Sequence, residues 1–208
     1  MKKNIQLLSL IISLYLLFLL ITLLVVQKNS LIPQIDYSAW QLLHSSNPVY
    51  LKFFQLITNL GQPLTVVLLA ILGNFLVNKQ QRIFLLTTII INTVGNHYFK
   101  YLIGRPRPQF PHLVKVQGYS FPSGHAVAIT TLVLVLQIII WQNTKKRLGL
   151  YLLALIALLI MGSRIILQVH FFSDVLAGCC IATANTLLIK YLLFDSHLTI
   201  FDSSNQKS

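Results

Sequence analysis

The chain has 208 residues, of which 55% are apolar and only 10% are charged. Soluble domains carry about 25% charged residues, so this composition and the positive mean hydropathy exclude an ordinary water-soluble domain. The 16 Lys and Arg residues outnumber 4 Asp and Glu residues, which gives a net charge of +12. A nucleic-acid-binding protein would spread such cations over a hydrophilic face that this chain lacks. We therefore expect an integral membrane protein with a lipid bilayer, and no nucleic acid, as its surroundings.

Acidic and sulfur ligands for a metal are scarce. The chain has no Glu, and its acids are Asp36, Asp174, Asp195 and Asp202. Cys179 and Cys180 are adjacent within an apolar run, which matches neither a zinc spacing nor a disulfide framework. We expect both cysteines to be small buried apolar residues, and we expect no metal and no other cofactor.

Six segments approach the length of about 20 apolar residues that a membrane-spanning helix needs. The predicted spans are approximately 5–26, 60–77, 83–99, 126–141, 148–163 and 175–193. The first span lacks a small-residue cleavage site after it, so it is interpreted as an uncleaved signal anchor. Together the segments predict an all-α, six-transmembrane helix bundle that forms a single domain over residues 1–208.

The remaining segments are more polar. Residues 27–59 contain scattered polar groups beside Trp40, Phe53 and Phe54, which favours short amphipathic helices at the outer membrane interface. Residues 196–208 are polar and short, and we expect them to be disordered.

The distribution of cations predicts the orientation. If the N-terminus is cytoplasmic, the C-terminus is cytoplasmic too, and seven of the 16 Lys and Arg residues lie outside. The other nine are inside, where Lys and Arg are enriched: Lys2, Lys3, Lys79, Arg82, Lys145, Lys146, Arg147, Lys190 and Lys207.

Three polar clusters fall at one face of the membrane, because successive spans alternate in direction. They occupy residues 100–108, 121–125 and 163–174. Interfacial anchoring explains one such cluster easily, but three clusters at one face favour a functional site.

The third cluster contains a candidate catalytic pair. His170 and Asp174 are four residues apart, so on a helix they would share a face, and the carboxylate could hold one ring nitrogen of the histidine. The other nitrogen would then be free as a nucleophile or a base. Asp174 would be a costly stray charge near the start of a span unless it had such a role.

The second cluster has the features of an anion site. Ser123 is a natural N-cap for the following helix, and Gly124 allows a ligand to approach the backbone. His125 is placed to protonate a leaving group. Lys100, Arg107 and Arg164 are expected to converge there, and three cations suit a phosphoryl group better than a carboxylate.

These residues match a known pattern. The series Lys-x6-Arg-Pro, Pro-Ser-Gly-His and Ser-Arg-x5-His-x3-Asp resembles the type 2 phosphatidic acid phosphatase (PAP2) superfamily. It reads here as Lys100 to Pro108, Pro122 to His125 and Ser163 to Asp174. The family spacing selects Arg107 rather than Arg105, so Arg105 is an auxiliary candidate whose replacement by Ala is expected to be mild.

The resemblance implies a mechanism. His170 would attack phosphorus and form a phosphohistidine, oriented by Asp174, while His125 would protonate the leaving oxygen. Bound phosphate would be stabilised by Lys100, Arg107, Ser123, Gly124 and Arg164. The superfamily also contains soluble vanadium-dependent haloperoxidases, and the six predicted spans argue against that branch.

The expected substrate is a membrane lipid phosphate, such as undecaprenyl diphosphate, phosphatidylglycerophosphate or phosphatidate. If Lys100, Arg107 and Arg164 are retained by the site, the cation bias becomes nine inside against four outside, and the site should face away from the cytoplasm. An anion transporter or channel using the same cations is the alternative, although transporters usually bind at the midplane. The oligomeric state, the physiological substrate and the role of His97 stay open.

Overall fold

The computed structural model describes residues 2–145 and 147–195, which form helices and loops without a β-strand. The expected disorder of residues 196–208 lies outside the described residues. The helices are α1 (Lys2–Val26), α2 (Leu31–Leu43), α3 (Pro48–Ile57), α4 (Pro63–Gly73), α5 (Lys79–Ile103), α6 (Gly124–Thr144), α7 (Leu148–Ile166) and α8 (Phe172–Lys190). Short single-turn segments are η1 (Thr58–Gly61), η2 (Asn74–Leu76) and the π-helical η3 (Tyr191–Asp195).

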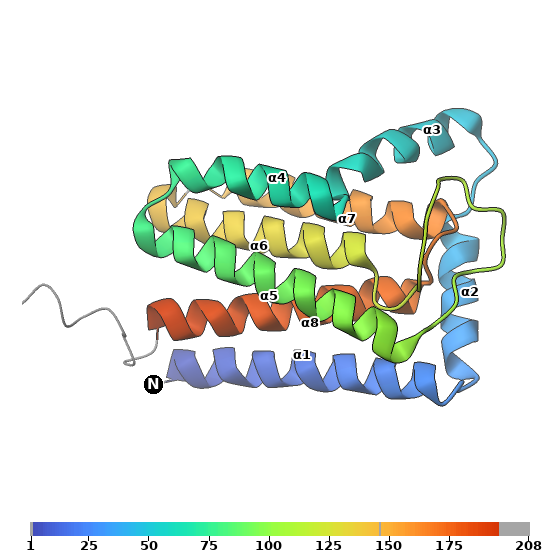
Figure 1. Cartoon of the computed structure of the whole chain (residues 1–208), viewed down its shortest axis with the longest axis horizontal. Coiled ribbons are helices and arrows are strands. Elements are labelled where there is room, and N and C mark those ends of the chain that lie inside the picture. Colours follow the sequence, from blue (N-terminus) through green and yellow to red (C-terminus); the bar gives the residue numbers. More distant parts are fainter. Residues whose placement is uncertain (1, 146, 196–208) are drawn as a thin grey trace, which may run out of the picture.

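Helices α1 and α4 to α8 lie side by side as one bundle (Figure 1). Helix α6 packs against α4, α5, α7 and α8, and α1 packs along α8. The start of α1 and the end of α8 lie at the same end of the bundle (Figure 1). The opposite end is covered by α2, α3 and the long connection between α5 and α6, and we call it the loop-rich end.

Some helices of the bundle have the length and apolar composition that a membrane-spanning helix needs. Among the described residues, four helices are long and apolar enough to cross a membrane: α1, α6, α7 and α8. The pair Pro48–Gly61 and Pro63–Leu76, bent by 50°, would be a fifth span if it counts as one. The predicted total of six spans is therefore not confirmed, although the chain is all-helical as expected.

Helix α5 corresponds to a predicted span, but it is not apolar enough to count among the candidate membrane spans. It is 25 residues long but carries Asn92, Asn96 and His97 in the half that approaches the site. Asn92 is buried, and its Oδ1 accepts a hydrogen bond of 2.8 Å from Nδ2 of Asn185 on α8. Such interhelical bonds satisfy polar groups inside a bundle, so the polarity of Asn92 is compatible with a spanning position, whereas His97 is exposed.

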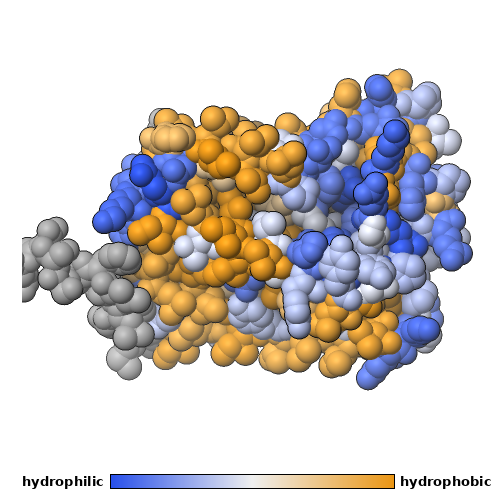
Figure 2. Space-filling model, viewed as in Figure 1, coloured by the Kyte–Doolittle hydropathy of each residue, from blue (hydrophilic) through white to orange (hydrophobic). Residues whose placement is uncertain are grey.

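The outer surface of the bundle agrees with a lipid environment. Apolar residues cover the flanks of the helices, and hydrophilic residues gather near both ends (Figure 2). Exposed large apolar side chains include Leu16, Leu68, Ile90 and Leu155 on four different helices. Soluble monomers rarely expose apolar surface of this extent.

Two backbone features fix the helix ends at the loop-rich end. Helix α5 stops at Gly104, whose φ of 61° is left-handed and costs least at glycine. Gly178 allows α8 to approach α6 closely, because a Cβ there would lie 3.0 Å from the carbonyl oxygen of Ser123. In addition, the Ser123 N–H donates to the Asp174 carbonyl at 3.0 Å. The starts of α6 and α8 are thereby held against each other.

Candidate active site

The three predicted clusters meet at the loop-rich end of the bundle. They come from the end of α5 and its following loop, the start of α6, and the connection between α7 and α8. A cavity of about 430 Å³ opens there, and six of the eight predicted site residues line it: Lys100, Arg107, Gly124, His125, Arg164 and His170. Ser123 and Asp174 lie behind this surface and are fully buried. The lining adds one cation that the motif search did not include, the exposed Lys115.

His170 and Asp174 are close, but they do not share a helical face. Helix α7 continues to Ile166, and α8 begins only at Phe172, so His170 lies in the connection between them. The prediction that a helix would align this pair is wrong in its local geometry. Gln168 has a φ of 60°, which turns the chain out of the helical path. The His170 Nδ1 nevertheless lies 3.5 Å from Asp174 Oδ2.

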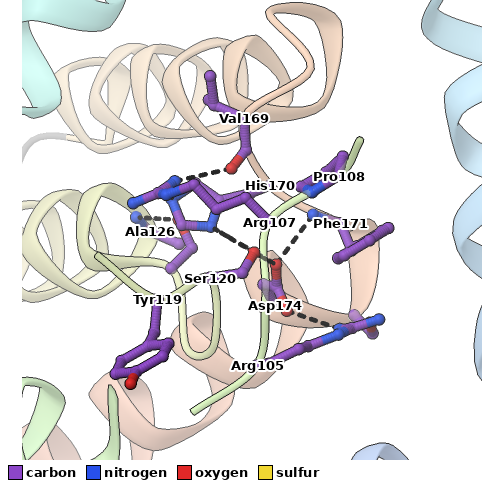
Figure 3. Close-up of polar contacts among 12 residues, drawn as sticks. Arg105, Arg107, Pro108, Tyr119, Ser120, Ala126, Val169, His170, Phe171 and Asp174 are labelled. Carbon is purple, nitrogen blue, oxygen red and sulfur yellow. Dashed lines mark hydrogen bonds and ion pairs between the residues drawn. The ribbon is translucent and has the colours of Figure 1, made fainter. Parts of the chain in front are cut away.

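The Asp174 carboxylate is held by several donors. Its Oδ2 accepts hydrogen bonds from the Phe171 N–H at 2.9 Å and from the Ser120 hydroxyl, and its Oδ1 accepts from Arg105 (Figure 3). Phe171 precedes α8 and Asp174 is at its third position, so the Asp174 side chain caps the helix start by accepting from the Phe171 N–H. Ser120 also lies 3.4 Å from His170 Nδ1. Ser120 was missed by the sequence analysis because no motif includes it.

Arg107 contacts the other ring nitrogen of His170. Its Nη1 lies 3.2 Å from His170 Nε2 and donates to the Val169 carbonyl at 2.7 Å. Its Nε and Nη2 donate to the carbonyls of Gly118 and Gln117. This guanidinium is therefore fixed at the cavity wall by backbone carbonyls. Burial lowers the pKa of both side chains, for His170 to about 3, so its imidazole is neutral at physiological pH.

Arg164 is buried, with 2% exposure, at the end of α7. Its Nη1 donates to the Thr58 hydroxyl at 2.6 Å, and its buried Nε has no partner among the described residues. Thr58 belongs to η1 and also lies 2.9 Å from the Ser163 hydroxyl. A buried guanidinium with an unpaired donor is costly unless an anion satisfies it. Thr58, which helps to hold Arg164, lies outside the three motifs, so the sequence did not point to it.

The remaining predicted phosphate ligands lie around the start of α6. Lys100 donates from Nζ to the Tyr119 carbonyl at 2.9 Å. Ser123 is the N-cap, as predicted, and accepts from the Ala126 N–H at 3.5 Å. A Cβ on Gly124 would lie 3.3 Å from Nδ2 of Asn96, so glycine leaves the room that this corner needs. Free N–H groups at such a helix start attract anions.

Arg105 lies outside the cavity lining, on the far side of Asp174 (Figure 3). It forms ion pairs of 2.6 Å with Asp174 and 2.8 Å with Asp36 of α2. The selection of Arg107 over Arg105 as the cavity arginine therefore agrees with the geometry. Asp36 is a second carboxylate at this end of the bundle, and it was not among the predicted site residues.

The other histidines do not line the cavity among the residues described. His97 packs on the ring of Tyr101, His44 stacks on Trp40, and His112 contacts the Pro108 carbonyl. His197 lies outside the described residues. Within residues 2–145 and 147–195, no group of three or more His, Cys, Asp or Glu side chains could hold a metal ion.

Comparison with known proteins identifies the family. A family model described as the PAP2 superfamily matches residues 81–198, which is more than half of the chain. The chain belongs to the PAP2 superfamily. The resemblance expected from the three motifs is thus confirmed, and the match includes all of them.

Individual PAP2 relatives are also similar. Phosphatidylglycerophosphatase B of Bacillus subtilis is 34% identical over 100 residues, which are 46% of this chain and 49% of that protein. The chain therefore spans about half the length of this curated relative.

Two solved structures resemble the whole fold. The structure of a transmembrane PAP2 type phosphatidylglycerolphosphate phosphatase from Bacillus subtilis matches with a TM-score of 0.78 and 25% identity, over 92% of this chain and 98% of that chain. Aquifex aeolicus LpxE matches with a TM-score of 0.62 and 26% identity, over 74% of this chain and 93% of that chain. Both matches support a multi-pass membrane protein.

Proposed function

We propose that this PAP2 protein hydrolyses a phosphomonoester or diphosphate on a membrane lipid, without a metal ion, through a phosphohistidine intermediate. The observation that carries the proposal is the arrangement around His170 Nε2. This nitrogen is an acceptor at the wall of a cavity that also holds His125 and the cations Lys100, Arg107 and Arg164. The lining contains no carboxylate to repel phosphate or to ligate a metal, so the donor set suits an anion.

In the first step, His170 Nε2 attacks phosphorus and the bond between phosphorus and the leaving oxygen breaks. His125 donates a proton to that oxygen, which leaves as the lipid alcohol or lipid phosphate. The new positive charge on the His170 ring is balanced by Asp174 on the Nδ1 side. In the second step, His125 accepts a proton from water, and the water oxygen displaces Nε2 to release inorganic phosphate.

Charge develops on the nonbridging oxygens of the phosphoryl group during both steps. Arg107 and Arg164 are held by bonds to Val169, Gly118, Gln117 and Thr58, so little reorganisation is needed when that charge appears. The unpaired Nε of Arg164 provides a donor that phosphate would satisfy. Lys100 and the Gly124 N–H complete the proposed phosphate site.

The substrate proposal rests on the relatives and on the surface. A Bacillus relative is named a phosphatidylglycerophosphatase, so phosphatidylglycerophosphate is the first candidate, with undecaprenyl diphosphate and phosphatidate after it. The apolar flanks end close to the loop-rich end, so a headgroup could enter the cavity while its chains stay in lipid (Figure 2). We propose that this end faces away from the cytoplasm, with both termini on the cytoplasmic side.

Purified protein in detergent with EDTA, assayed for phosphate release from a panel of these three lipids, tests the proposal. His170→Ala is the inactive control, and His97→Ala is the matched histidine replacement outside the cavity. We expect release from at least one lipid, unaffected by EDTA and lost only in His170→Ala. Release that stops on chelation would exclude the metal-free mechanism, and no release from any lipid would contradict the function.

A further inference from the structure

We propose that Asp36 of α2 is a positioning residue for the reaction, acting on Asp174 through Arg105. The inference rests on the proposed phosphatase function, because it assigns Asp36 and Arg105 to the control of the His170–Asp174 pair. Neither residue lines the cavity that holds the proposed phosphate site. Both line a neighbouring cavity of about 360 Å³ that also reaches His170. The route proposed to the reaction is the direct ion pair of Arg105 with Asp174.

The Arg105 guanidinium joins two carboxylates that come from distant parts of the chain. Its Nη1 donates to Asp174 Oδ1 at 2.6 Å and to Ser173 Oγ at 2.7 Å, and its Nη2 donates to Asp36 Oδ2 at 2.8 Å. The guanidinium carbon also lies 4.1 Å from the ring centroid of Phe171. Its side chain is 13% exposed. These contacts leave the guanidinium one orientation, because its donors lie in a rigid plane.

The buried carboxylate of Asp36 accepts three hydrogen bonds. Its Oδ1 accepts the Ser173 N–H at 2.8 Å, and its Oδ2 accepts the Ser173 hydroxyl at 2.9 Å in addition to Arg105. Its side chain is 3% exposed, although α2 belongs to the segment that was predicted to lie at the membrane interface. Burial of a carboxylate is unfavourable without such partners. Asp36 thus ties α2 both to the start of α8 and to Arg105.

This arrangement determines how Asp174 faces His170. Arg105 occupies Oδ1 of Asp174, while Ser120 and the Phe171 N–H occupy Oδ2, which faces His170 Nδ1. If Asp36 is neutralised, Arg105 loses one of its two anionic partners and its orientation is no longer fixed. The Oδ1 side of the Asp174 carboxylate can then shift while Ser120 and the Phe171 N–H still hold Oδ2, and displacements of about 1 Å in such groups can reduce turnover about 100-fold.

The ion pairs also revise the expectation for Arg105. The motif spacing alone predicted a mild effect of Arg105→Ala, because the side chain was not needed for phosphate. Since Arg105 contacts Asp174 directly, we now expect a severe loss of kcat with little change in KM. That pattern distinguishes a positioning residue from a phosphate ligand, whose loss would also raise KM.

The test is Asp36→Asn, made in the wild-type protein and in an Asp174→Asn background. The substitution keeps the shape but places an NH2 group against donors, since both oxygens of Asp36 accept hydrogen bonds. In the wild-type background we expect kcat to fall about 10- to 100-fold with KM within about twofold. In the Asp174→Asn background, measured with radiolabelled lipid, we expect no further loss, because the residue through which Asp36 acts is already absent.

Asp195→Asn is the matched control, because it removes the carboxylate of another ion pair, with Lys190, at the opposite end of the bundle. It should leave turnover unchanged in both backgrounds. Equal fractional losses from Asp36→Asn in the two backgrounds, or a loss that appears only as raised KM, would overturn the inference. An inactive wild-type protein would instead contradict the proposed function, so the two failures are distinguishable.

A second variant covers the case in which Asp36→Asn folds poorly. Arg105→Ala should regain part of its kcat when millimolar guanidinium is added, because the ion can occupy the space between the two carboxylates. Arg82→Ala, at the start of α5, is the control for nonspecific effects of guanidinium. Absence of rescue in a folded Arg105→Ala protein, judged by its thermal transition in detergent, would count against the positioning role.

Discussion

The Nη1 of Arg107 lies 3.2 Å from Nε2 of His170. Arginine can only donate, so Nε2 is the acceptor and its lone pair is unprotonated. The single proton of the neutral ring must then be on Nδ1, which faces Asp174 Oδ2 at 3.5 Å and Ser120 Oγ at 3.4 Å. Hydrogen bonds on both sides of the ring therefore select the tautomer in which Nε2 is nucleophilic.

The first prediction concerns pH. Burial lowers the pKa of His170 to about 3, below the ordinary value of about 6.5. The folded protein therefore keeps this ring neutral at pH 5, whereas the unfolded chain binds a proton there, and the contribution of His170 to stability is lost as the pH falls below about 6.5. Histidine ¹⁵N NMR, with the signal assigned by its loss in His170→Ala, should show no titration between pH 8 and 5. A midpoint near 6.5 would contradict the buried neutral state.

The second prediction concerns Thr58, which accepts a hydrogen bond from Arg164. Thr58→Val removes that acceptor at nearly constant volume, and hydrogen bonds to charged groups contribute about 1.5–3 kcal/mol. We expect kcat/KM to fall at least about tenfold and the effect to vanish in an Arg164→Ala background. Thr22→Val is the control, because the Thr22 hydroxyl donates to the Phe18 carbonyl within its own helix, α1, far from the site residues in sequence. A loss that persists without Arg164 would show that Thr58 acts by another route.

The third prediction assigns proton donation to His125. His125→Ala should slow the first turnover about 100-fold or more for alkyl phosphates, whose leaving oxygen needs a proton. For p-nitrophenyl phosphate, a good leaving group, the loss should be much smaller. The first-turnover rate is the quantity to measure, because the later attack of water also uses His125. Equal losses for both substrates would exclude its role as the acid.

The fourth prediction concerns Gly61, the last residue of η1, which precedes the bend into α4. A Cβ at this position would lie 2.3 Å from Cγ2 of the buried Ile160. Gly61→Ala should therefore lower stability by about 1–3 kcal/mol, measured as the thermal transition in detergent. Ile160→Ala should partly suppress the effect, because it removes the clashing methyl group. Gly73→Ala, where a Cβ would meet nothing within 4 Å, is the control and should be close to neutral. Additive effects of Gly61→Ala and Ile160→Ala would contradict the clash.

Much of this site could be predicted because its residues occur at fixed spacings near helix ends. Alternating helices bring the ends of α5 and α7 and the starts of α6 and α8 to one end of the bundle, whatever their detailed packing. Capping chemistry likewise predicts the role of Ser123 from its immediate neighbours. Six of the residues that line the cavity were therefore identifiable without tertiary information, whereas Thr58 and Lys115 were not.

The contacts that position those residues were not predictable in the same way. Asp36 and Arg105 are 69 residues apart, and Thr58 and Arg164 are 106 apart, so no local pattern connects them. Their pairing depends on where α2 and η1 pack across the end of the bundle. The course of the chain before α8 was also missed, because it depends on the left-handed conformation of Gln168, a residue type with no strong preference for it.

The central claim is that His170 Nε2 forms a covalent bond to phosphorus. The most direct measurement is to mix the protein with lipid labelled with ³²P in the phosphate that is released, quench within milliseconds in alkali, and locate the label by peptide mapping. The account predicts label that is stable in alkali, labile in acid and confined to the peptide containing His170, with none in His170→Ala. Phosphate release at the wild-type rate with no labelled protein at any quench time, or label on a different residue, would contradict it.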